Sequence, residues 1–451
     1  MQIQKIPGLP SHQILLSNRF PNSRRPEDNR VFFHFGSWVK KVDIQYDEHI
    51  SENTIGLPVK FSQHITIPAT IPYELFLDGP HIHVGPVIAF MVSRKKLTTK
   101  LLDYYRVYVS NCQNLKGLIY VCSLNEINIA NKTVQGYYYN PVRANRGKDP
   151  WEKGNFPYPG ALYRKIRLVN DIRYNDLSGR VGNKIFNSVN FNKLQLKEIL
   201  TSDPQMRKHL PDTAPLKNVK ALNKMLNLHG SVYLKPVKGA FGAGIQKVDR
   251  VKSRKDYIFI HRDGTKTVVN KIRTVEKLFR RLTNSEHYLI QQSVAFISKN
   301  KHVDFRVIMQ KDESENWKCS GIIARFGKER RIYTNDISSI QLGRAALRTT
   351  FQLDDDQASN KEQEIISICK QACVILEKFY GNYGDLGIDV VVDKALKVWL
   401  LEVNCQHQPE IAAPKEDPQM FYTVITRPFE YAKALAGFTK EKMAFLENQQ
   451  N

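Results

Sequence analysis

Three glycines follow a lysine at a spacing that suits the binding of phosphate groups. Lys235 ends an expected strand and precedes Gly239, Gly242 and Gly244. Glycines let backbone N–H groups approach phosphate oxygens without a side-chain clash, and the lysine ammonium can reach the same oxygens. No Gly-Lys-Ser/Thr follows the last glycine, so this is not a Walker A loop. Taken alone, a turn with three glycines is more often only a turn.

Two carboxylates and an amide are expected on one face of a hairpin near the end of the chain. Asp389 lies in an expected strand over 386–393, and Glu402 and Asn404 lie in the next, over 398–403 and just beyond. Glu402 and Asn404 are two residues apart, so their side chains point to one face. Mg²⁺ prefers such oxygen ligands shared with phosphates. The apolar neighbours indicate buried strands, where a carboxylate needs a partner.

Arginines on neighbouring strands complete the set. Arg306 follows Asp304 on an expected strand over 304–310, Arg325 lies near the end of another over 317–326, and Asn335 follows after a loop. Arginine suits the charge of a transferring phosphoryl group or an acyl phosphate. A structural ion pair on the same face is an equal alternative for Arg306. Together the segments predict a site for a nucleoside triphosphate and its magnesium.

The elements that position these residues divide the chain into four parts. Short runs of β-branched and aromatic residues predict a β-rich N-terminal domain. Strands and helices then alternate, which indicates an α+β catalytic region. We expect a β-rich domain over 1–150, a linker with a first helical α/β part over 151–230, a glycine-loop subdomain over 231–295 and a metal-site subdomain over 296–451.

Periodicity predicts the individual elements of the second half. Helices are expected over 181–200, 218–228, 275–282, 361–380 and 429–448, with a short helix starting at Asp203-Pro204. Strands are expected over 163–170, 231–235 and 288–292, with a hairpin around Asp263-Gly264.

The charge of the chain is concentrated in its middle. The net charge is +23, and residues 151–282 carry 28 Lys and Arg against 10 Asp and Glu. Such a field favours an acidic partner, although a solvated basic face is an equal alternative. We do not expect a nucleic-acid partner, because no recognised module or aromatic interleaving accompanies the charge.

Other sequence features point to a reduced, cytosolic protein. The six cysteines form no C-x-x-C pair, so we expect neither a zinc site nor disulfides. We do not expect His64, His81 and His83 to bind metal, since His81 and His83 fit one strand face. No apolar run reaches the length of a membrane span, and no signal peptide is visible at the N-terminus.

In order and spacing, the motifs resemble the ATP-grasp superfamily. They are Lys235-Pro236 with the glycine loop, Ile290-Gln291-Gln292, Asp304-Phe305-Arg306, Asp389 and Glu402-Val403-Asn404. The closer resemblance, over roughly 80–440, is to the YheC/YheD group, described as endospore coat-associated. The resemblance implies two α+β subdomains that grip ATP, preceded here by the β-rich domain.

The resemblance also implies a role for each motif residue. Lys193 and Lys235 would contact the nucleotide or its phosphates, and the glycine loop would cover the phosphates. The hinge at the adenine would comprise Gln291, Gln292 and Val294, with Gln292 where the family often carries Glu. The metal ligands would be Asp389, Glu402 and Asn404, and the residues facing the γ-phosphate and the acceptor would be Arg306, Arg325 and Asn335.

The implied function is an ATP-dependent ligase, with Mg²⁺ or Mn²⁺, that joins a carboxylate to an amine or related nucleophile through an acyl phosphate. The substrate would be acidic, such as a peptide or a spore-envelope component. The protein would act during sporulation in the mother-cell cytoplasm and associate with the forespore coat. The family usually has a Gly-Gly pair after the Asn335 position, and this chain does not. The alternative is therefore a structural coat-associated protein that keeps the fold and binds ATP without catalysis.

Overall fold

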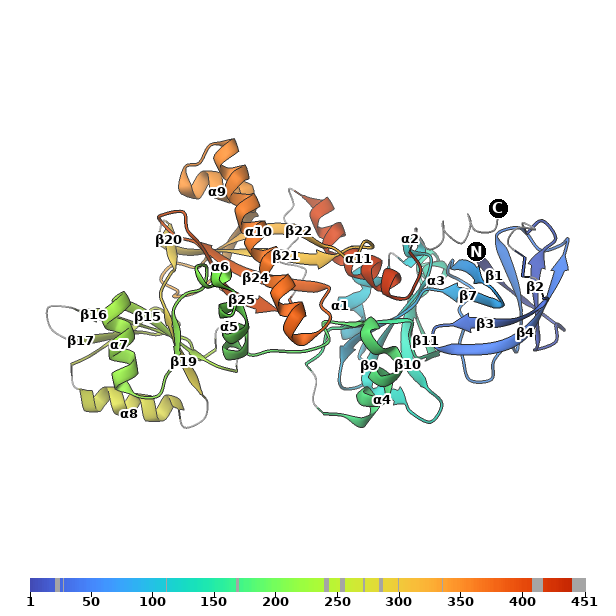
Figure 1. Cartoon of the computed structure of the whole chain (residues 1–451), viewed down its shortest axis with the longest axis horizontal. Helices are drawn as coiled ribbons and strands as arrows, with labels where there is room; N and C mark the ends of the chain where they lie inside the picture. Colours follow the sequence, from blue (N-terminus) through green and yellow to red (C-terminus); the bar gives the residue numbers. More distant parts are fainter. Residues whose placement is uncertain are drawn as a thin grey trace.

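Four sheets follow one another along an elongated molecule (Figure 1). The computed structural model describes residues 1–439 apart from 21–24, 27, 111, 168–169, 239–242, 252–255, 271, 284–286, 299, 335 and 408–416. Within that part of the chain, no helix is both long and apolar enough to cross a membrane.

The first two sheets lie at one end of the molecule and share one hydrophobic core with helix α11. The first has the strand order β1-β5-β2-β4-β3-β7-β6 and the second β11-β10-β9-β8-β12-β13. The strands are β1 (Gln2–Ile6), β2 (Gln13–Ser17), β3 (Arg30–Phe35), β4 (Trp38–Asp47), β5 (Thr54–Pro58), β6 (Glu74–Asp78), β7 (His81–Gly85), β8 (Val87–Ser93), β9 (Leu118–Asn128), β10 (Thr133–Tyr139), β11 (Trp151–Pro157), β12 (Ala161–Arg164) and β13 (Ile185–Phe186). The helices of this region are α1 (Thr99–Val109), α2 (Cys112–Leu115), α3 (Pro141–Asn145), α4 (Ile172–Val181) and the 3-10 helix η2 (Gly182–Lys184).

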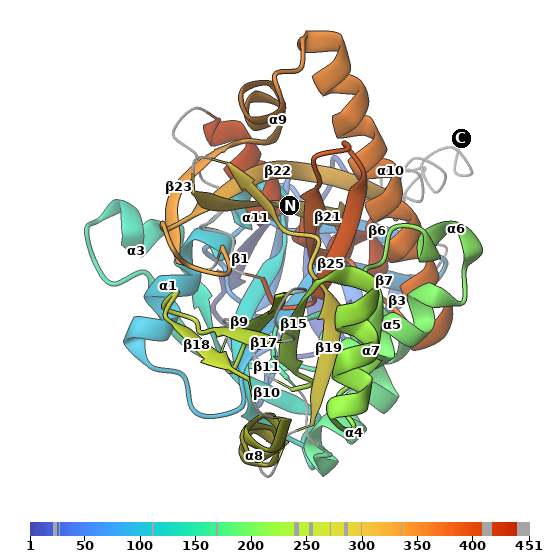
Figure 2. The same ribbon diagram turned by 90° about the vertical axis from the view of Figure 1, so that its left-hand side faces the viewer.

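The third sheet, which we call the lid sheet, has the strand order β14-β19-β15-β16-β17-β18 and its own small core. Two helices, α7 (Val219–His229) and α8 (Ile272–Thr283), pack on the lid sheet. The sheet and both helices face the viewer in Figure 2. The strands are β14 (Thr213–Pro215), β15 (Ser231–Pro236), β16 (Gln246–Val251), β17 (Asp256–Ile260), β18 (Lys266–Val269) and β19 (Tyr288–Gln292). The predicted hairpin around Asp263-Gly264 is confirmed as the antiparallel pair β17–β18.

The fourth sheet, which we call the catalytic sheet because the sequence analysis predicted catalytic residues on its strands, has the order β23-β22-β21-β24-β25, with β20 paired to β21. The strands are β20 (Phe296–Ser298), β21 (Lys301–Lys311), β22 (Trp317–Gly327), β23 (Ile337–Leu342), β24 (Asp385–Val392) and β25 (Val398–Asn404). The accompanying helices are α5 (Lys193–Thr201), α6 (Pro204–Arg207), α9 (Gly343–Phe351), α10 (Asp355–Tyr380) and α11 (Pro418–Leu435).

The two faces of the catalytic sheet differ in character. Alternate residues of β21 and β24, such as Phe305, Val307 and Ile388, pack in a core with α10. The residues between them, such as Arg306 and Asp389, therefore point to the opposite face. That face carries the charged groups of the site described below.

The helix predicted over 181–200 is wrong. The structure has α4 ending at Val181, then η2 and β13, and a second helix, α5, beginning at Lys193. Gly182 has a φ of +65° and ends α4. Asn192 forms a capping box with Gln195 that starts α5. The strand predicted over 163–170 is also shorter and earlier, as β12.

The helix predicted to start at Phe429 begins instead at Pro418, where the Asp417 side chain caps it. The structure describes the chain only to residue 439, so the predicted end at 448 lies outside the described residues. Pro428 sits inside α11 and cannot donate to the Val424 carbonyl four residues earlier. The Gln310 side-chain amide donates to that carbonyl over 2.9 Å, which replaces the missing bond.

Candidate functional site

A cleft with about 730 Å³ of empty space lies between the lid sheet and the catalytic sheet. Both sheets contribute to its walls, and a loop at 332–334 closes one side. The lining residues are Tyr233, Lys235, Ile245, Gln291, Gln292, Val294, Ala295, His302, Val303, Asp304, Ile332, Tyr333, Thr334, Asp389, Val391, Leu401 and Glu402. The structure therefore brings together predicted residues that are more than 160 positions apart in the chain.

Lys235 lies on the lid wall of the cleft. Its Nζ donates to Gln291 Oε1 over 2.6 Å and lies 5.6 Å from the centre of the Tyr233 ring. Desolvation lowers the pKa of Lys235 to about 8, against an opposing effect of Glu402. The ammonium thus gains little from its own surroundings and is available to an incoming anion.

Lys193 lies in a second, smaller pocket next to the cleft. Lys235 and Glu402 line this pocket as well as the main cleft. Lys193 Nζ is 3.9 Å from Glu402 Oε1. The two lysines and this carboxylate are therefore one continuous charged surface.

Asp389 and Glu402 are direct partners across β24 and β25. The register shifts next to this pair, so that Leu401 is an extra residue in β25. Both carboxylates line the cleft. Asn404 pairs with Gly387, two residues further along each strand, and is not among the lining residues.

Buried ion pairs hold the two predicted arginines. Arg306 donates to Asp389 through Nε over 2.5 Å and through Nη2 over 3.2 Å. Arg325 donates to both oxygens of Asp304, over 2.7 and 2.8 Å, and its Nη2 is 3.0 Å from Asp389 Oδ1. The Thr334 hydroxyl donates to Asp304. Neither arginine is among the residues that line the cleft.

Burial and charge act in opposite directions in this network. Burial would raise the pKa of Asp389, but Arg306 and Arg325 hold it below its ordinary value. Burial likewise opposes the charge of Arg325, yet Asp304 and Asp389 raise its pKa. Asp389 and Arg325 are therefore both charged at neutral pH.

The donor set fits a magnesium ion only together with phosphate oxygens. Among the described residues, no three His, Cys, Asp or Glu side chains are grouped to hold a metal. Asp389 and Glu402 face the same cleft as Lys235, and Mg²⁺ is commonly bound by one or two carboxylates plus substrate phosphates. Asp389 Oδ1, however, already accepts from both arginines.

The predicted hinge residues Gln291, Gln292 and Val294 all line the cleft. Gln291 bridges Lys235 and the Thr213 hydroxyl, and Gln292 Oε1 accepts from the Asp212 backbone over 3.1 Å. β14 and Asp212, the residue before it, therefore hold the two glutamine side chains in place.

Gly244 is the described part of the predicted glycine loop. It has a φ of +72°, and a Cβ there would come within 2.8 Å of Pro236 and of the Tyr288 hydroxyl. Only glycine fits this close turn. Gly239, Gly242 and Asn335 lie outside the described residues, so their predicted roles stay predictions.

Several lining residues were missed by the sequence analysis. Tyr233 shares a strand face with Lys235, two positions on, and this alternation could have identified it. Tyr333 and Thr334 come from an irregular loop that carries no periodic signal. Only the fold places them opposite the lid.

Beside the cleft, described residues of the lid sheet contact the loop at 330–336 at three points. The Tyr233 hydroxyl donates to the Ile332 carbonyl over 2.9 Å, and Arg262 contacts both Tyr333 and Asp336. At the β17–β18 turn, a Cβ on Gly264 would come within 2.0 Å of the Arg330 carbonyl oxygen. The lid is thus closed against the loop at 330–334.

Gly264→Ala should open this closed arrangement and weaken nucleotide binding about tenfold, the effect of losing roughly 1.4 kcal/mol. The new Cβ would overlap backbone that cannot move aside cheaply. Gly230→Ala is the matched control, because Gly230 also has a positive φ, of +71°, but nothing within 4 Å. Calorimetric titration with ATP measures both. Equal losses in the two variants would attribute the effect to backbone strain and not to the lid contact.

Comparison with known proteins agrees with this geometry. A family model described as "YheC/D like ATP-grasp" matches residues 182–435, which contain the lid sheet, the catalytic sheet and every lining residue of the cleft. The chain belongs to this ATP-grasp family. The resemblance inferred from the motifs and the predicted ATP-grasp fold, with its β-rich N-terminal region, are confirmed.

Similar proteins include two from Bacillus subtilis (strain 168). Endospore coat-associated protein YheD is 23% identical over 435 residues, covering 92% of this chain and 93% of that protein. Endospore coat-associated protein YheC is 24% identical over 233 residues, covering 49% of this chain and 62% of that protein. Among solved structures, the D-alanine-D-alanine ligase from Coxiella burnetii is 11% identical, with a TM-score of 0.43, over 80% of this chain and 97% of that one.

Proposed function

We propose that this ATP-grasp protein binds magnesium and ATP in the cleft and uses them to ligate a carboxylate to an amine or related nucleophile. The observation that carries the proposal is that Lys235, the hinge glutamines and the facing pair Asp389 and Glu402 line one cleft between two subdomains. Lys235 and Lys193 would hold the phosphates. Val294 with Gln291 and Gln292 would hold the adenine.

Phosphoryl transfer to a carboxylate would give an acyl phosphate, which the nucleophile then attacks. The protein contributes positioning and charge neutralisation. Arg306 and Arg325 lie directly behind the carboxylates that face the cleft and would stabilise the transferring group. Bound magnesium would supply further neutralisation, held by Asp389 and Glu402 with Asn404 as the third predicted ligand.

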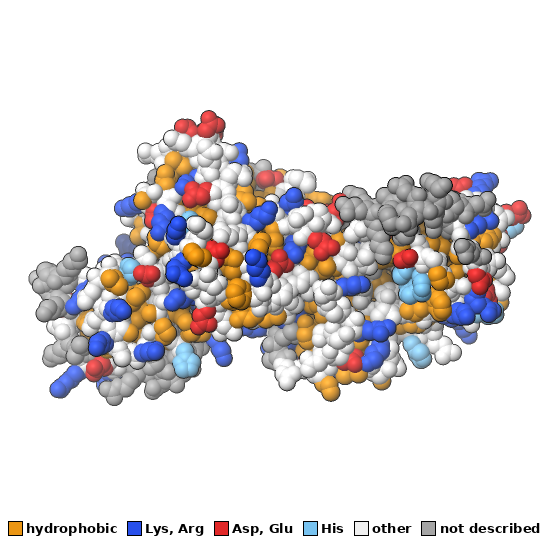
Figure 3. Space-filling model, viewed as in Figure 1, with side chains coloured by type: hydrophobic (Ala, Val, Ile, Leu, Met, Phe, Trp, Pro, Cys, Tyr) orange, Lys and Arg blue, Asp and Glu red, His pale blue; other side chains and the backbone are white. Residues whose placement is uncertain are grey.

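The proposed substrate is an acidic molecule such as a peptide or a spore-envelope component. The basic residues support this class, although on the face shown in Figure 3 they are spread among acidic ones over the lid and catalytic regions. The proposed location is the mother-cell cytoplasm at the forming spore coat. The names of the similar proteins, which call them endospore coat-associated, support the association with the coat.

Glu402→Gln should reduce magnesium-dependent ATP affinity about tenfold or more, because it removes one of two carboxylates from the site. Calorimetry with ATP, in magnesium and in EDTA, measures the effect. Glu362→Gln is the control, since Glu362 pairs with Arg344 outside the cleft. The proposed metal site is wrong if wild type binds ATP equally well with and without magnesium.

The second candidate is a coat-associated protein that binds ATP without catalysis. It is favoured by the arginines, which are buried in ion pairs and do not line the cleft. ADP release measured with spore extract as the acceptor separates the candidates. Magnesium-dependent binding without any ADP release would support the second.

A further inference from the structure

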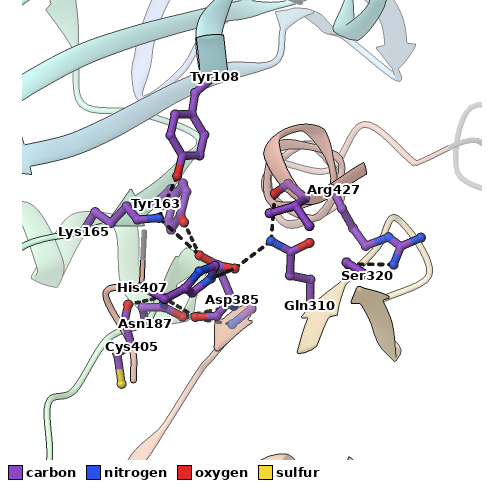
Figure 4. Close-up of polar contacts among 12 residues, drawn as sticks. Tyr108, Tyr163, Lys165, Asn187, Gln310, Ser320, Asp385, Cys405, His407 and Arg427 are labelled. Atoms are coloured by element: carbon purple, nitrogen blue, oxygen red, sulfur yellow. Dashed lines mark hydrogen bonds and ion pairs between the residues drawn. The ribbon is translucent and has the colours of Figure 1, made fainter. Parts of the chain in front are cut away.

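A buried carboxylate joins the catalytic sheet to the second sheet. Asp385 begins β24 and is 1% exposed. Figure 4 shows side chains from separate elements turned toward it. Asp385 accepts from Gln310 Nε2 over 2.7 Å and from the Tyr163 hydroxyl, and lies 3.6 Å from Lys165 Nζ.

His407 is the fourth partner of Asp385. Its Nε2 lies 2.7 Å from Asp385 Oδ1. Burial would raise the pKa of Asp385, but His407 and Lys165 lower it well below its ordinary value, so the carboxylate is ionised and only accepts. Nε2 must therefore donate. Burial lowers the pKa of His407 below its usual range, so its second nitrogen, Nδ1, carries a lone pair.

That lone pair is buried and unused. His407 is 5% exposed, and Nδ1 has no hydrogen-bond partner among the described residues. A buried acceptor without a partner is costly. Asp385 accepts from Nε2 and so fixes the tautomer in which Nδ1 is an acceptor. It provides no donor for that acceptor, because a carboxylate has none.

The imidazole lies next to the stem of Arg306. Asp385, Gly387 and Asp389 share one face of β24. Gly387 has no side chain, and a Cβ there would meet His407 Cγ at 3.0 Å and Arg306 Cδ at 3.3 Å. His407 Nδ1 is bonded to Cγ and Arg306 Nε to Cδ, so the imidazole and the end of the Arg306 stem border the same space above Gly387.

Binding of an ion to Asp389 would weaken the hydrogen bond that Asp389 accepts from Arg306. Its Nε now donates to Asp389 Oδ1, which also accepts from Arg325. An ion that binds Asp389 competes for this oxygen. If Arg306 lost its acceptor without another within reach, its buried N–H group would be unpaired, which is costly for a charged group.

We propose that the Asp385–His407 pair holds an acceptor in reserve for Arg306, so that Arg306 Nε transfers from Asp389 to His407 Nδ1 when magnesium and nucleotide bind. His407 is thus a positioning residue that acts through Arg306. The inference rests on the proposed function, because it requires Asp389 to become a metal ligand.

Two isosteric substitutions test this transfer. In His407→Asn, the asparagine Oδ1 takes the place of Nδ1 and is still an acceptor for Arg306. In His407→Gln, the glutamine NH₂ group takes the place of Nε2, so it keeps the bond to Asp385 but leaves no acceptor for Arg306. Calorimetry with AMP-PNP, in magnesium and in EDTA, gives the metal-dependent gain in affinity. We expect His407→Gln to lose about tenfold of that gain, His407→Asn to keep it within about twofold, and the affinities in EDTA to be equal.

The opposite results overturn the inference. A full gain in both variants shows that no reserve acceptor is needed, and a loss in both shows a packing role. In wild type, the ¹⁵N resonance of His407 Nδ1 should shift with AMP-PNP and magnesium but not with AMP-PNP in EDTA. An unshifted resonance contradicts the transfer even if a variant fails to fold. If wild type shows no metal-dependent affinity at all, the proposed function itself fails.

Discussion

Lys235→Met should reduce the affinity for ATP about 30- to 100-fold, the effect of losing a charge-assisted hydrogen bond worth roughly 2–3 kcal/mol. Lys235 lies on the wall of the cleft, and among the described residues its hydrogen-bond partner is the neutral Gln291, so a phosphate is the strongest acceptor it can gain. Methionine keeps the length and apolar stem of the side chain. Calorimetric titration with ATP and magnesium measures the change.

The pH dependence of binding gives an independent check. The pKa of Lys235 in the empty protein is about 8, because burial disfavours the charge, and bound phosphates would raise it. Wild-type affinity should therefore be level below pH 8 and fall as pH rises above it, by up to about tenfold per unit. Lys235→Met should show no such fall.

Lys220→Met, an exposed change on α7 of the same subdomain, is the control and should behave as wild type. If Lys235→Met also matches wild type, the nucleotide is not held where the lysine lies. If both variants lose affinity equally, the effect reflects the net charge of the lid and not a specific contact.

The strands that carry the motifs could be predicted because their patterns are local. The hairpin of β24 and β25 follows from apolar runs on both sides of a turn, and it placed Asp389 beside Glu402 as the structure does. The same logic gave the β17–β18 hairpin. The helix expected over 218–228 is likewise present as α7, and the Asn218 side chain caps its start.

The errors occurred where a distant residue decides the local structure. Pro428 is a helix breaker in sequence, but Gln310 supplies the bond that its carbonyl partner lacks. Asn187, between α4 and α5, has a φ of +53° and its side chain bonds the backbones of Asp385 and Cys405. Both contacts join residues more than 100 positions apart, so no local pattern reveals them.

The two ion pairs that Asp389 forms with Arg306 and Arg325 could not be predicted either. The sequence suggested both a metal ligand and an ion pair on this face, but their combination depends on the sheet order, which places β22 and β24 on either side of β21. Arg325 thereby reaches across β21 to Asp389 as well as to Asp304.

Arg325→Met should destabilise the catalytic half by about 3–5 kcal/mol, the usual effect of leaving a buried charge uncompensated. Arg325 is 2% exposed and bonds two carboxylates, and no solvent can replace it. Differential scanning calorimetry should show the midpoint of unfolding lowered on the order of 10 °C. Arg344→Met, which removes an exposed pair with Glu362, should cost under about 1 kcal/mol.

A second substitution can show whether unpaired charge or lost packing causes the lower stability of Arg325→Met. If unpaired charge is responsible, adding Asp304→Asn to Arg325→Met should recover part of the stability, whereas a packing defect would remain. Without Arg325, burial should raise the pKa of Asp389, which keeps only Arg306 as a charged partner. The variant's deficit in stability relative to wild type should therefore shrink as pH falls and Asp389 takes up a proton. A deficit that stays constant from neutral to acidic pH would instead assign Arg325 a packing role. Arg306 alone would then stabilise the negative charge of Asp389.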